Sequence, residues 1–360
     1  MKTIKENTTI SLSVIEEMDL MGHEQIMFCN DSESGLKAII AIHNTNLGPA
    51  LGGARMWDYK SESDALEDVL RLSRGMTYKA AISGLDLGGG KAVIIGDPYT
   101  QKDENLMRSF GRFVDSLSGR YITAEDVGMT TQDIKYVRSE TEHVTGMPEN
   151  QGGSGSPSPV TAYGVYQGMK ASAKFKWGSD SLKHKKILVQ GVGHVGEHLI
   201  KYLTNEGASI LIHEINNKRA EEIAIKYGVV PVSSEEVYGI DVDIYSPCAL
   251  GGTLNPKTIK MLKCQIVAGA ANNQLEDESR DALLLHEKEI LYAPDFLINA
   301  GGLISVYAEI KGYDKQETMS KTKEIFNTTM EIFTTADMDS ITPHEAALKI
   351  AQERVDAVKI

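Results

Sequence analysis

The chain has 360 residues and a formal net charge of −13 at neutral pH, with 41% hydrophobic and 24% charged residues. This length suffices for two domains of ordinary size, and the composition excludes a disordered polymer. The acidic balance disfavours nucleic acid and anionic membranes as partners, because both need a basic surface. No apolar run approaches the length of a membrane span, and residues 1–7 lack the apolar core of a secretion signal.

The cysteines and histidines give no sign of a metal site. The three cysteines, Cys29, Cys248 and Cys264, show no CxxC spacing, and the nine histidines show no paired ligand spacing. An odd number of scattered cysteines indicates neither a disulfide framework nor a zinc site. The chain is therefore predicted to be a reduced cytoplasmic protein without a structural metal.

The first part of the chain is predicted to open with two strands. Residues 25–31 and 36–44 have strand composition and are separated by the turn-rich Ser32-Glu33-Ser34-Gly35. The segment that follows, residues 47–57, is rich in glycine and is predicted to be a loop.

A long amphipathic helix is predicted next. Ser61 and Asp64 match a capping box, which satisfies free backbone N–H groups at a helix start. An apolar stripe recurs at helical spacing and consists of Leu66, Val69, Leu70 and Met76. Lys79 lies three residues beyond Met76 on the same face, so this lysine is predicted to point inward or to the edge of a cleft.

Three consecutive glycines, Gly88 to Gly90, precede Lys91 and a predicted strand at residues 92–95. They predict a glycine-floored turn, because glycine tolerates φ > 0 and close approach of another molecule but has no side chain to pack. The ammonium groups of Lys79 and Lys91 beside this turn predict a site for a small anionic substrate. An ordinary turn between solvated lysines is the alternative.

A predicted helix at residues 105–117 is followed by a short strand that ends in two carboxylates, the second being Asp126. Groups at the carboxyl ends of strands line the ligand crevice of open α/β sheets. Asp126 is therefore a candidate acid–base group. A helix cap is the alternative, although Thr130 and Thr131 can fill that role.

Residues 145–159 are dense in glycine, serine and proline and are predicted to link two domains. A helix over residues 160–176 opens the second half, with Pro159 suited to its first turn. Further helices are predicted at residues 314–334 and 343–358.

The second half contains a GxGxxG motif between a strand at residues 186–190 and a helix. The motif is Gly191-Val192-Gly193-His194-Val195-Gly196. A second strand, at residues 209–214, ends in Glu214 about twenty residues after the first glycine. This context predicts a Rossmann dinucleotide site in which Glu214 binds the ribose hydroxyls, favouring NAD over NADP.

Three later strands, at residues 242–246, 264–268 and 291–293, are each followed by small or amide residues. A doubly wound sheet displays such loops along the edge where a dinucleotide lies. Candidate contacts in these loops are Ala249, Leu250, Asn273 and Asn299. The two asparagines are predicted to hold the nicotinamide and its ribose or, alternatively, to cap helices.

Five segments together resemble the amino-acid dehydrogenases that act on glutamate, leucine, phenylalanine and valine. They are GPALGGARM (48–56), MTYK (76–79), GLDLGGGK (84–91), TAEDVG (123–128) and SPSPVTA (156–162). The resemblance covers nearly the whole chain and is nearest to the members that act on leucine; the first eleven residues look like an extension. It implies an α/β fold with a cleft between two domains.

The resemblance also implies domain boundaries and an activity. Residues 1–147 would form a substrate-binding and oligomerisation domain, residues 148–330 a Rossmann NAD-binding domain, and residues 331–360 a helix packing back toward the first domain. The implied reaction is reversible, NAD-dependent oxidative deamination of a branched-chain L-amino acid to its 2-oxo acid and ammonia. The implied assembly is a homo-oligomer, an octamer or a dimer, with no membrane or nucleic-acid partner.

By similarity, Lys79 pairs with the substrate carboxylate, Lys91 is the general base, and Asp126 shuttles protons to and from the amino group. A lysine base needs a lowered pKa, which burial and a second nearby ammonium group can provide, and Lys79 is the predicted second group. The remaining candidates for substrate and cofactor contacts are Leu51, Gly52, Gly53, Met76, Ala124, Thr145, Leu303 and Val306 for the substrate, and Thr161 for the cofactor.

Leu51 stands where glutamate-specific relatives have a lysine, and an unpaired glutamate carboxylate against it would be costly. An aliphatic or aromatic substrate is thus favoured, and a phenylalanine- or valine-preferring enzyme is the first alternative because Leu303 resembles phenylalanine dehydrogenases. An NAD-sensing protein that has lost catalysis is the second. Asn272, His213 and Ser156 depart from the family pattern.

Overall fold

The structure is a computed structural model that describes residues 13–148, 153–312 and 314–358. The chain divides into two compact units, here called unit 1 (Met1–Thr77 and Leu87–Val144) and unit 2 (Tyr78–Asp86 and Thr145–Ile360). Helix α2 (Glu62–Ile82) begins in unit 1, and its last turn groups with unit 2. The predicted eleven-residue extension lies outside the described residues.

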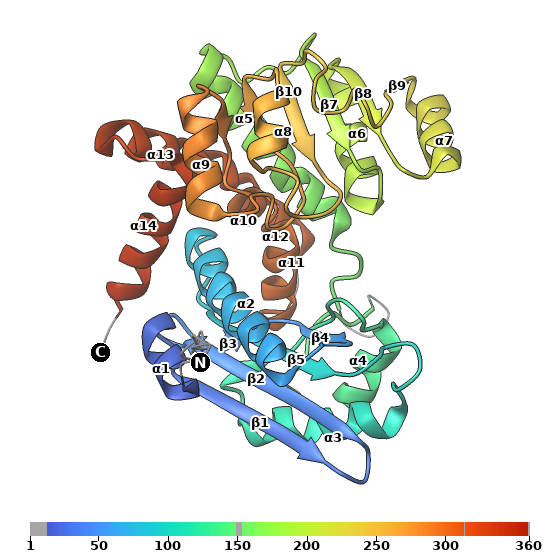
Figure 1. The fold of residues 1–360 in the computed structure, drawn as a ribbon, viewed down its shortest axis with the longest axis vertical. Coiled ribbons are helices and arrows are strands. Elements are labelled where there is room, and N and C mark those ends of the chain that lie inside the picture. The colour runs from blue at the N-terminus through green and yellow to red at the C-terminus, as the bar shows by residue number, and fades with distance from the viewer. Residues whose placement is uncertain (1–12, 149–152, 313, 359–360) are drawn as a thin grey trace, which may run out of the picture. The chain divides into compact units, whose positions relative to one another are not determined.

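Unit 1 contains a mixed six-stranded sheet (Figure 1). Its strands are β1 (Gln25–Asp31), β2 (Leu36–Asn44), β3 (Ala50–Leu51), β4 (Ala54–Trp57), β5 (Gly88–Ile95) and β6 (Tyr121–Ile122). They are ordered β1-β2-β5-β3-β6, with β4 also pairing with β5. The pairs β1–β2 and β2–β5 are antiparallel, and the others are parallel. The other helices are α1 (Val14–Met21), α3 (Glu104–Ser116) and α4 (Thr131–Arg138).

The local signals for β1, β2 and α2 are confirmed. Both strands have their predicted bounds and form a hairpin, with Gln25 opposite Ile42. Ser61 caps α2 by accepting a hydrogen bond from the backbone N–H of Asp64 at 3.1 Å. The apolar stripe of α2 packs on the sheet in a buried cluster that contains Ile39, Ala41, Ala65, Leu66, Val69, Leu70 and Val93. This packing orients one face of β2 and β5 toward α2.

The prediction of a glycine-floored turn at Gly88 to Gly90 is wrong, because these residues form the first half of strand β5. None of them has positive φ. A Cβ on Gly89 would lie well under 3.0 Å from the backbone nitrogen of Thr77, and one on Gly90 would lie 2.7 Å from the ring of Tyr121. Glycine is needed at these positions because Thr77 and Tyr121 pack so closely against β5 that a Cβ atom would clash with them.

The loop prediction for residues 47–57 is also wrong. This segment contains β3 and β4, which pair in parallel with successive halves of β5: Leu51 lies opposite Gly89, and Ala54 lies opposite Ala92. The composition of this segment did not predict strands, because glycine is depleted in strands and weakens them.

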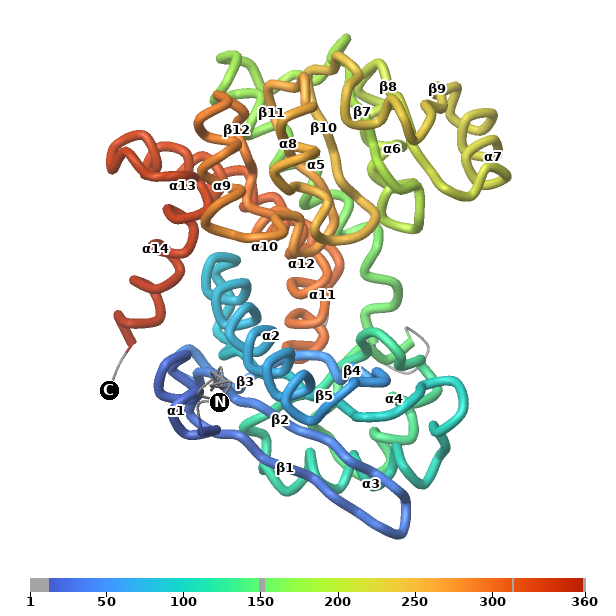
Figure 2. The backbone as a smooth tube through the Cα atoms, viewed as in Figure 1, coloured from blue at the N-terminus to red at the C-terminus, as the bar shows by residue number. Residues whose placement is uncertain are grey.

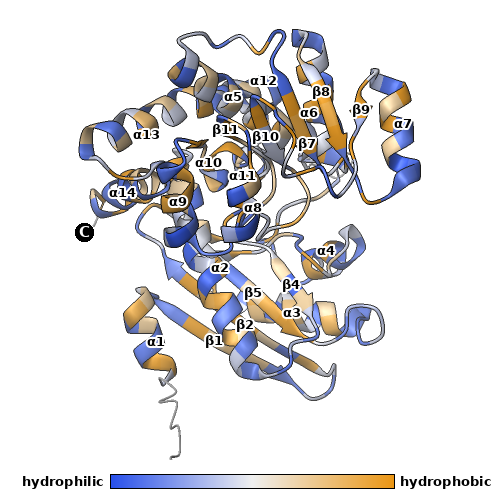
Figure 3. Ribbon diagram, turned by 45° about the horizontal axis from the view of Figure 1, so that its top comes forward, coloured by the Kyte–Doolittle hydropathy of each residue, from blue (hydrophilic) through white to orange (hydrophobic). Residues whose placement is uncertain are grey.

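Unit 2 contains a six-stranded parallel sheet in the order β12-β11-β10-β7-β8-β9 (Figure 2). Its strands are β7 (Lys186–Gln190), β8 (Ser209–His213), β9 (Val230–Pro231), β10 (Ile244–Pro247), β11 (Ile266–Val267) and β12 (Leu291–Tyr292). Counted along the chain, this is the order typical of doubly wound dinucleotide folds, with the switch point between β7 and β10. The central strands are hydrophobic (Figure 3), as expected of a parallel sheet covered on both faces.

The helices of unit 2 include two that the sequence predicted as one. They are α5 (Ser158–Trp177), α6 (His194–Glu206), α7 (Asn217–Tyr227), α8 (Pro256–Met261), α9 (Glu278–Glu287), α10 (Asp295–Ile298), α11 (Gly301–Ile310), α12 (Lys315–Lys323), α13 (Ile325–Asp339) and α14 (Pro343–Asp356). The single helix predicted at residues 314–334 is divided at Glu324 into α12 and α13. The predicted α/β fold, with a doubly wound second half, is confirmed. Among the described residues, no helix combines the length and apolarity that crossing a membrane requires.

Candidate active site

A buried ion pair joins two predicted catalytic residues in unit 1. Lys91 lies on β5 and is 6% exposed, and its Nζ donates to Oδ2 of Asp126, four residues after the end of β6. Burial lowers the pKa of Lys91; Asp126 opposes this shift without cancelling it, and Arg55 adds to it. Burial raises the pKa of Asp126, but Lys91 and Arg55 outweigh it, so that pKa lies below its ordinary value. Thr130 is the N-cap residue of α4, so Asp126 does not cap this helix.

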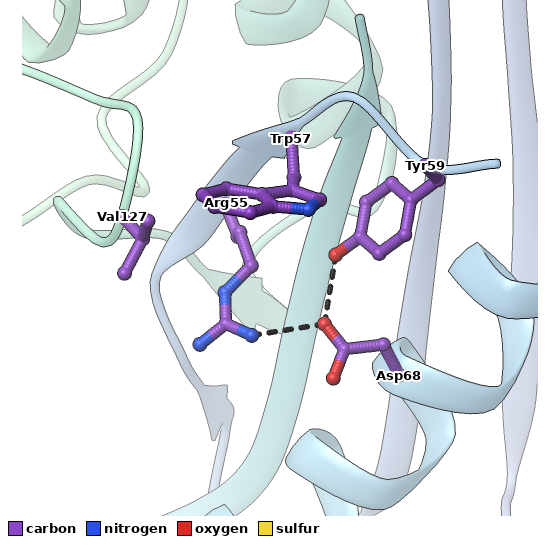
Figure 4. Close-up of a pocket in the computed structure, with 5 residues that line it drawn as sticks. All are labelled: Arg55, Trp57, Tyr59, Asp68 and Val127. Atoms are coloured by element: carbon purple, nitrogen blue, oxygen red, sulfur yellow. Dashed lines mark hydrogen bonds and ion pairs between the residues drawn. The ribbon is translucent and has the colours of Figure 1, made fainter. Parts of the chain in front are cut away.

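Arg55 is a site residue that the sequence reasoning missed. On β4, Ala54 and Met56 are fully buried, whereas Arg55 and Trp57 alternate with them on the other face. Arg55, Trp57, Tyr59, Asp68 and Val127 line a pocket of about 420 Å³ (Figure 4). The alternation along residues 54–57 is the signal that could have identified this strand and its outward arginine.

Two predicted substrate residues of unit 1, Gly52 and Gly53, lie close to the backbone around this ion pair. Leu51 is 3% exposed on β3. A Cβ on Gly53 would lie 2.8 Å from Cβ of Asp126 and 3.3 Å from the carbonyl oxygen of Ala124. A Cβ on Gly52 would collide with the carbonyl group of Gly90, directly before Lys91. Unit 1 thus brings Leu51, Gly52, Gly53 and Ala124 to strand β5, which carries Lys91, or to the segment after β6 that carries Asp126.

Lys79 lies in the last turn of α2 and makes its described hydrogen bonds within unit 2. Its Nζ donates to Oδ1 of Asn299 at 2.6 Å and of Asn272 at 3.4 Å. Asn272, which departs from the family pattern, also accepts from Nδ2 of Asn299 at 2.7 Å. Met76, one turn earlier on α2, is half-buried. Lys79 and Lys91 belong to different units, so their joint action on one substrate remains a proposal.

Arg354 on α14 holds the end of the helix that carries Lys79. Its Nη1 donates to the carbonyl oxygens of Ala81 at 2.9 Å and Leu85 at 2.8 Å, and its Nη2 donates to Oδ1 of Asp86 at 3.0 Å. The last carbonyls of a helix have no partner within the helix, and a guanidinium satisfies both them and the negative end of the helix dipole.

The glycine motif forms the turn between β7 and α6. Gly191 has φ of +96°, and a Cβ on Gly196 would collide with the carbonyl oxygen of Gly191. A Cβ on Gly193, in contrast, would meet nothing within 4 Å, and this residue begins α6 without a side-chain cap. The outer glycines therefore serve the turn and the strand–helix contact, whereas the middle one leaves open space before free backbone donors. This is the space that a dinucleotide pyrophosphate needs.

Glu214 and Ala249 both contact the glycine motif. Glu214 follows β8, and its Oε2 accepts from the backbone N–H of Val192 at 3.0 Å. Ala249 follows β10, and a Cβ on Gly191 would lie 2.7 Å from Cβ of Ala249, so the two loops meet at the switch point of the sheet. The neighbouring candidates His194 and Leu250 are exposed, and Val195 is half-buried.

Three of the remaining candidates of unit 2 lie on or beside helix α11. Thr161 on α5 lies beside the start of α11, since a Cβ on Gly302 would lie 3.2 Å from its Oγ1. Leu303 is buried and Val306 half-buried on the same α11. Asn273 is exposed with a φ of +50°, and Thr145 is buried.

Among the described residues, histidine, cysteine, aspartate and glutamate side chains do not gather in groups able to hold a metal ion. His213, another departure from the family pattern, is buried with Nδ1 at 3.3 Å from the carbonyl oxygen of Val232. It therefore packs within the sheet of unit 2.

Comparison with known proteins identifies the family of this chain. Residues 23–143 match the family model of the Glu/Leu/Phe/Val dehydrogenase dimerisation domain, and residues 152–213 and 210–359 match that of Glutamate/Leucine/Phenylalanine/Valine dehydrogenase. Leucine dehydrogenase of Geobacillus stearothermophilus is 50% identical, over 97% of this chain and 95% of that protein. Phenylalanine dehydrogenase of Caldalkalibacillus thermarum is 47% identical, over 97% and 94%. The crystal structure of L-tryptophan dehydrogenase from Nostoc punctiforme aligns with a TM-score of 0.87 at 44% identity, over 97% of this chain and all of that one. The chain is an enzyme of the Glu/Leu/Phe/Val amino-acid dehydrogenase family.

Proposed function

We propose that the protein catalyses reversible, NAD-dependent oxidative deamination of a branched-chain L-amino acid, with L-leucine favoured. The products are the 2-oxo acid and ammonia. The observation that carries this proposal is the buried Lys91–Asp126 ion pair. This pair places a base and an acid side by side. The leucine dehydrogenase of Geobacillus stearothermophilus, which is 50% identical in sequence to this chain, also supports the proposal.

When bound, NAD⁺ would supply the hydride acceptor that turns the substrate amine into an imine. Neutral Lys91 then takes a proton from water as its oxygen attacks the imine carbon, and burial of this lysine supports that role because it favours the uncharged form. Asp126, which first takes a proton from the substrate ammonium group, returns that proton to the nitrogen of the tetrahedral adduct. As the C–N bond breaks, Asp126 accepts the proton of the adduct's hydroxyl group, which yields the 2-oxo acid and releases ammonia. Hydrogen bonding to Lys91 keeps the two groups in position for these transfers.

Lys79 is proposed to bind the α-carboxylate of the substrate. Its ammonium is directed by Asn299, whose side chain is almost fully buried. An ammonium group held at a defined place can pair with a carboxylate at a smaller entropic cost.

The NAD site is proposed at the turn between β7 and α6. The open space before Gly193 and the start of α6 fit the pyrophosphate. Glu214 fits the ribose hydroxyls, and its negative charge would repel the 2′-phosphate of NADP. The carboxylate is oriented by the backbone N–H groups of Val192 and Asn216, at 3.0 Å each.

Specificity is proposed to come from apolar walls in both units. Leu51 and Ala124 in unit 1, and Leu303 and Val306 in unit 2, offer no partner for a charged substrate side chain. A glutamate carboxylate there would lose its hydration without compensation, at several kcal/mol. A homo-oligomeric assembly in the cytoplasm completes the proposal, supported by the match to a dimerisation domain.

The test is a panel of amino acids assayed by NADH absorbance with NAD and NADP. We expect the highest kcat/KM with L-leucine and NAD, followed by isoleucine and valine, with glutamate essentially inactive. A preference for phenylalanine or tryptophan would assign the enzyme to the aromatic branch of the family. NAD binding without turnover of any amino acid would instead support the NAD-sensing alternative.

A further inference from the structure

Arg55 connects two carboxylates on the face of the unit 1 sheet that carries Lys91. Its Nη1 lies 2.9 Å from Oδ2 of Asp68 on α2, and its Nε lies 3.4 Å from Oδ2 of Asp126 (Figure 4 shows the Asp68 contact). The same Oδ2 atom of Asp126 accepts from Nζ of Lys91. Oδ2 of Asp126 therefore lies between the cations of Lys91 and Arg55, and Arg55 is held in place by Asp68.

The outer end of this chain of contacts is well anchored. Oδ2 of Asp68 also accepts from the hydroxyl of Tyr59 at 2.7 Å, and its Oδ1 accepts from Nη2 of Arg71 at 3.0 Å. The side chains of Arg55 and Asp68 are 23% and 16% exposed, whereas that of Arg71 is 55% exposed. Arg55 is thus held between β4 and α2 and cannot readily leave Asp126.

The charges around Asp126 act in one direction. Arginine keeps its charge throughout the working pH range, unlike lysine. The described ionisable groups that act on the pair are Arg55 and Asp68. Tyr121 is buried and interacts electrostatically with Asp126, and Tyr59 and Arg71 are hydrogen-bonded to Asp68. Arg55 lowers the pKa of both Asp126 and Lys91, because a fixed positive charge favours the carboxylate and disfavours the ammonium.

We propose that Arg55 is a positioning residue that holds Asp126 against Lys91 and sets the pH range in which the pair works. This inference rests on the proposed function, because it gives Asp126 and Lys91 their roles in the reaction. Arg55 itself acts only through Asp126.

The experiment compares the pH profile of kcat/KM for L-leucine in Arg55→Gln with that of the wild type. Removing the charge of Arg55 should raise the pKa of both Asp126 and Lys91. Each limb of the pH profile of kcat/KM that depends on these two groups should therefore move to higher pH, by about one unit. We also expect kcat to fall about tenfold. Arg71→Gln is the matched control, because it removes a guanidinium from the other oxygen of Asp68 without touching Asp126, and its profile should stay in place. An unshifted profile in folded Arg55→Gln overturns the proposal.

A second variant covers the case in which Arg55→Gln does not fold. Arg55→Lys keeps the charge but lacks the forked geometry that reaches both carboxylates. It should show a reduced kcat with limbs close to those of the wild type, and a wild-type kcat would overturn the positioning role.

A chemical titration separates failure of this inference from failure of the proposed function. The reaction of Lys91 with acetic anhydride, followed by mass spectrometry across pH, reports deprotonation of Lys91 without reference to turnover. We expect its midpoint to rise in Arg55→Gln and not in Arg71→Gln; an unchanged midpoint refutes the inference. Activity retained in Lys91→Ala would instead refute the proposed function.

Discussion

The ammonium group of Lys79 and the amide oxygen of Asn299 are 2.6 Å apart, although 220 residues separate them in the chain. Asn299 is 4% exposed, and its Nδ2 donates to the carbonyl oxygen of Ala270 at 3.2 Å. These contacts fix which end of the amide faces Lys79. A buried amide thereby directs the cation that we propose to bind the substrate.

Replacing Asn299 with alanine should weaken substrate binding more than it weakens the fold. A hydrogen bond to a charged group contributes about 1.5–3 kcal/mol, so kcat/KM for L-leucine should fall by about ten- to a hundredfold, mostly through KM. Asn272→Ala is the control for a weaker contact, because Oδ1 of Asn272 lies 3.4 Å from Nζ of Lys79. It should reduce kcat/KM less than Asn299→Ala does. Steady-state kinetics with thermal melts provide the measurement. A kcat effect with unchanged KM would argue against the role assigned to Lys79.

Substitution of Glu214 should relax cofactor choice. In Glu214→Ser the acceptor for two ribose hydroxyls and the repulsion of a 2′-phosphate are both lost, so the ratio of kcat/KM with NAD to that with NADP should fall at least about tenfold. Glu222→Gln removes the same charge from an exposed position on α7 and should leave the ratio unchanged. If Glu214→Ser kept the wild-type ratio, the ribose role would have to be abandoned.

Two glycines of unit 1 should respond to alanine in opposite ways. Gly89→Ala would place a Cβ against the backbone of Thr77 and should destabilise the protein by about 3 kcal/mol. On α2, a Cβ at Gly75 would meet nothing within 4 Å, so Gly75→Ala should stabilise the helix by about 0.5–1 kcal/mol. Urea unfolding followed by circular dichroism distinguishes them. Equal stabilities for the two variants would mean that β5 tolerates side chains at its start.

Acid should destabilise the protein through two buried histidines. Burial lowers the pKa of both His23 and His43 to about 4 from 6.5. Between pH 6.5 and 4 these histidines bind protons in the unfolded chain but not in the folded chain. The free energy of unfolding therefore falls as the pH falls through this window, by about 3 kcal/mol for each histidine.

The variant His23→Gln tests this window. Glutamine retains a polar group that can reach the hydroxyl of Ser73, which lies 2.8 Å from Nε2 of His23, but it does not titrate. The loss of stability between pH 6.5 and 4 should therefore shrink by roughly half. Replacing the exposed His184 with asparagine is the control and should not change the slope. The same slope in His23→Gln and wild type would assign acid lability to other groups.

The elements that the sequence predicted best are those with local signals. The bounds of β1, β2 and β7 follow from apolar runs closed by turn residues, and the start of α2 follows from the side chain of Ser61. The turn at Gly191 was predictable for the same reason, because its strand, glycines and helix are contiguous. The ion pair of Lys91 with Asp126 was accessible only through resemblance to a family.

What the sequence could not reveal depends on contacts between distant segments. Gly88 to Gly90 look like a turn until Thr77 and Tyr121 are seen against them. The sequence did not indicate Arg55 as a cation beside Lys91, because its anchor Asp68 lies on a different element. That Lys79 is a second ammonium group near Lys91 stays a prediction. The roles of Leu51, Val306 and the other candidate substrate contacts stay predictions.

The attachment of Arg354 to the end of α2 has a practical consequence for handling this enzyme. Arg354 lies two residues before the end of α14, so a truncation that removes the last turn of this helix also removes Arg354. Loss of its contacts with Ala81 and Leu85 would uncap the turn that carries Lys79. A variant truncated before Arg354 should therefore lose affinity for the amino acid while still binding NAD.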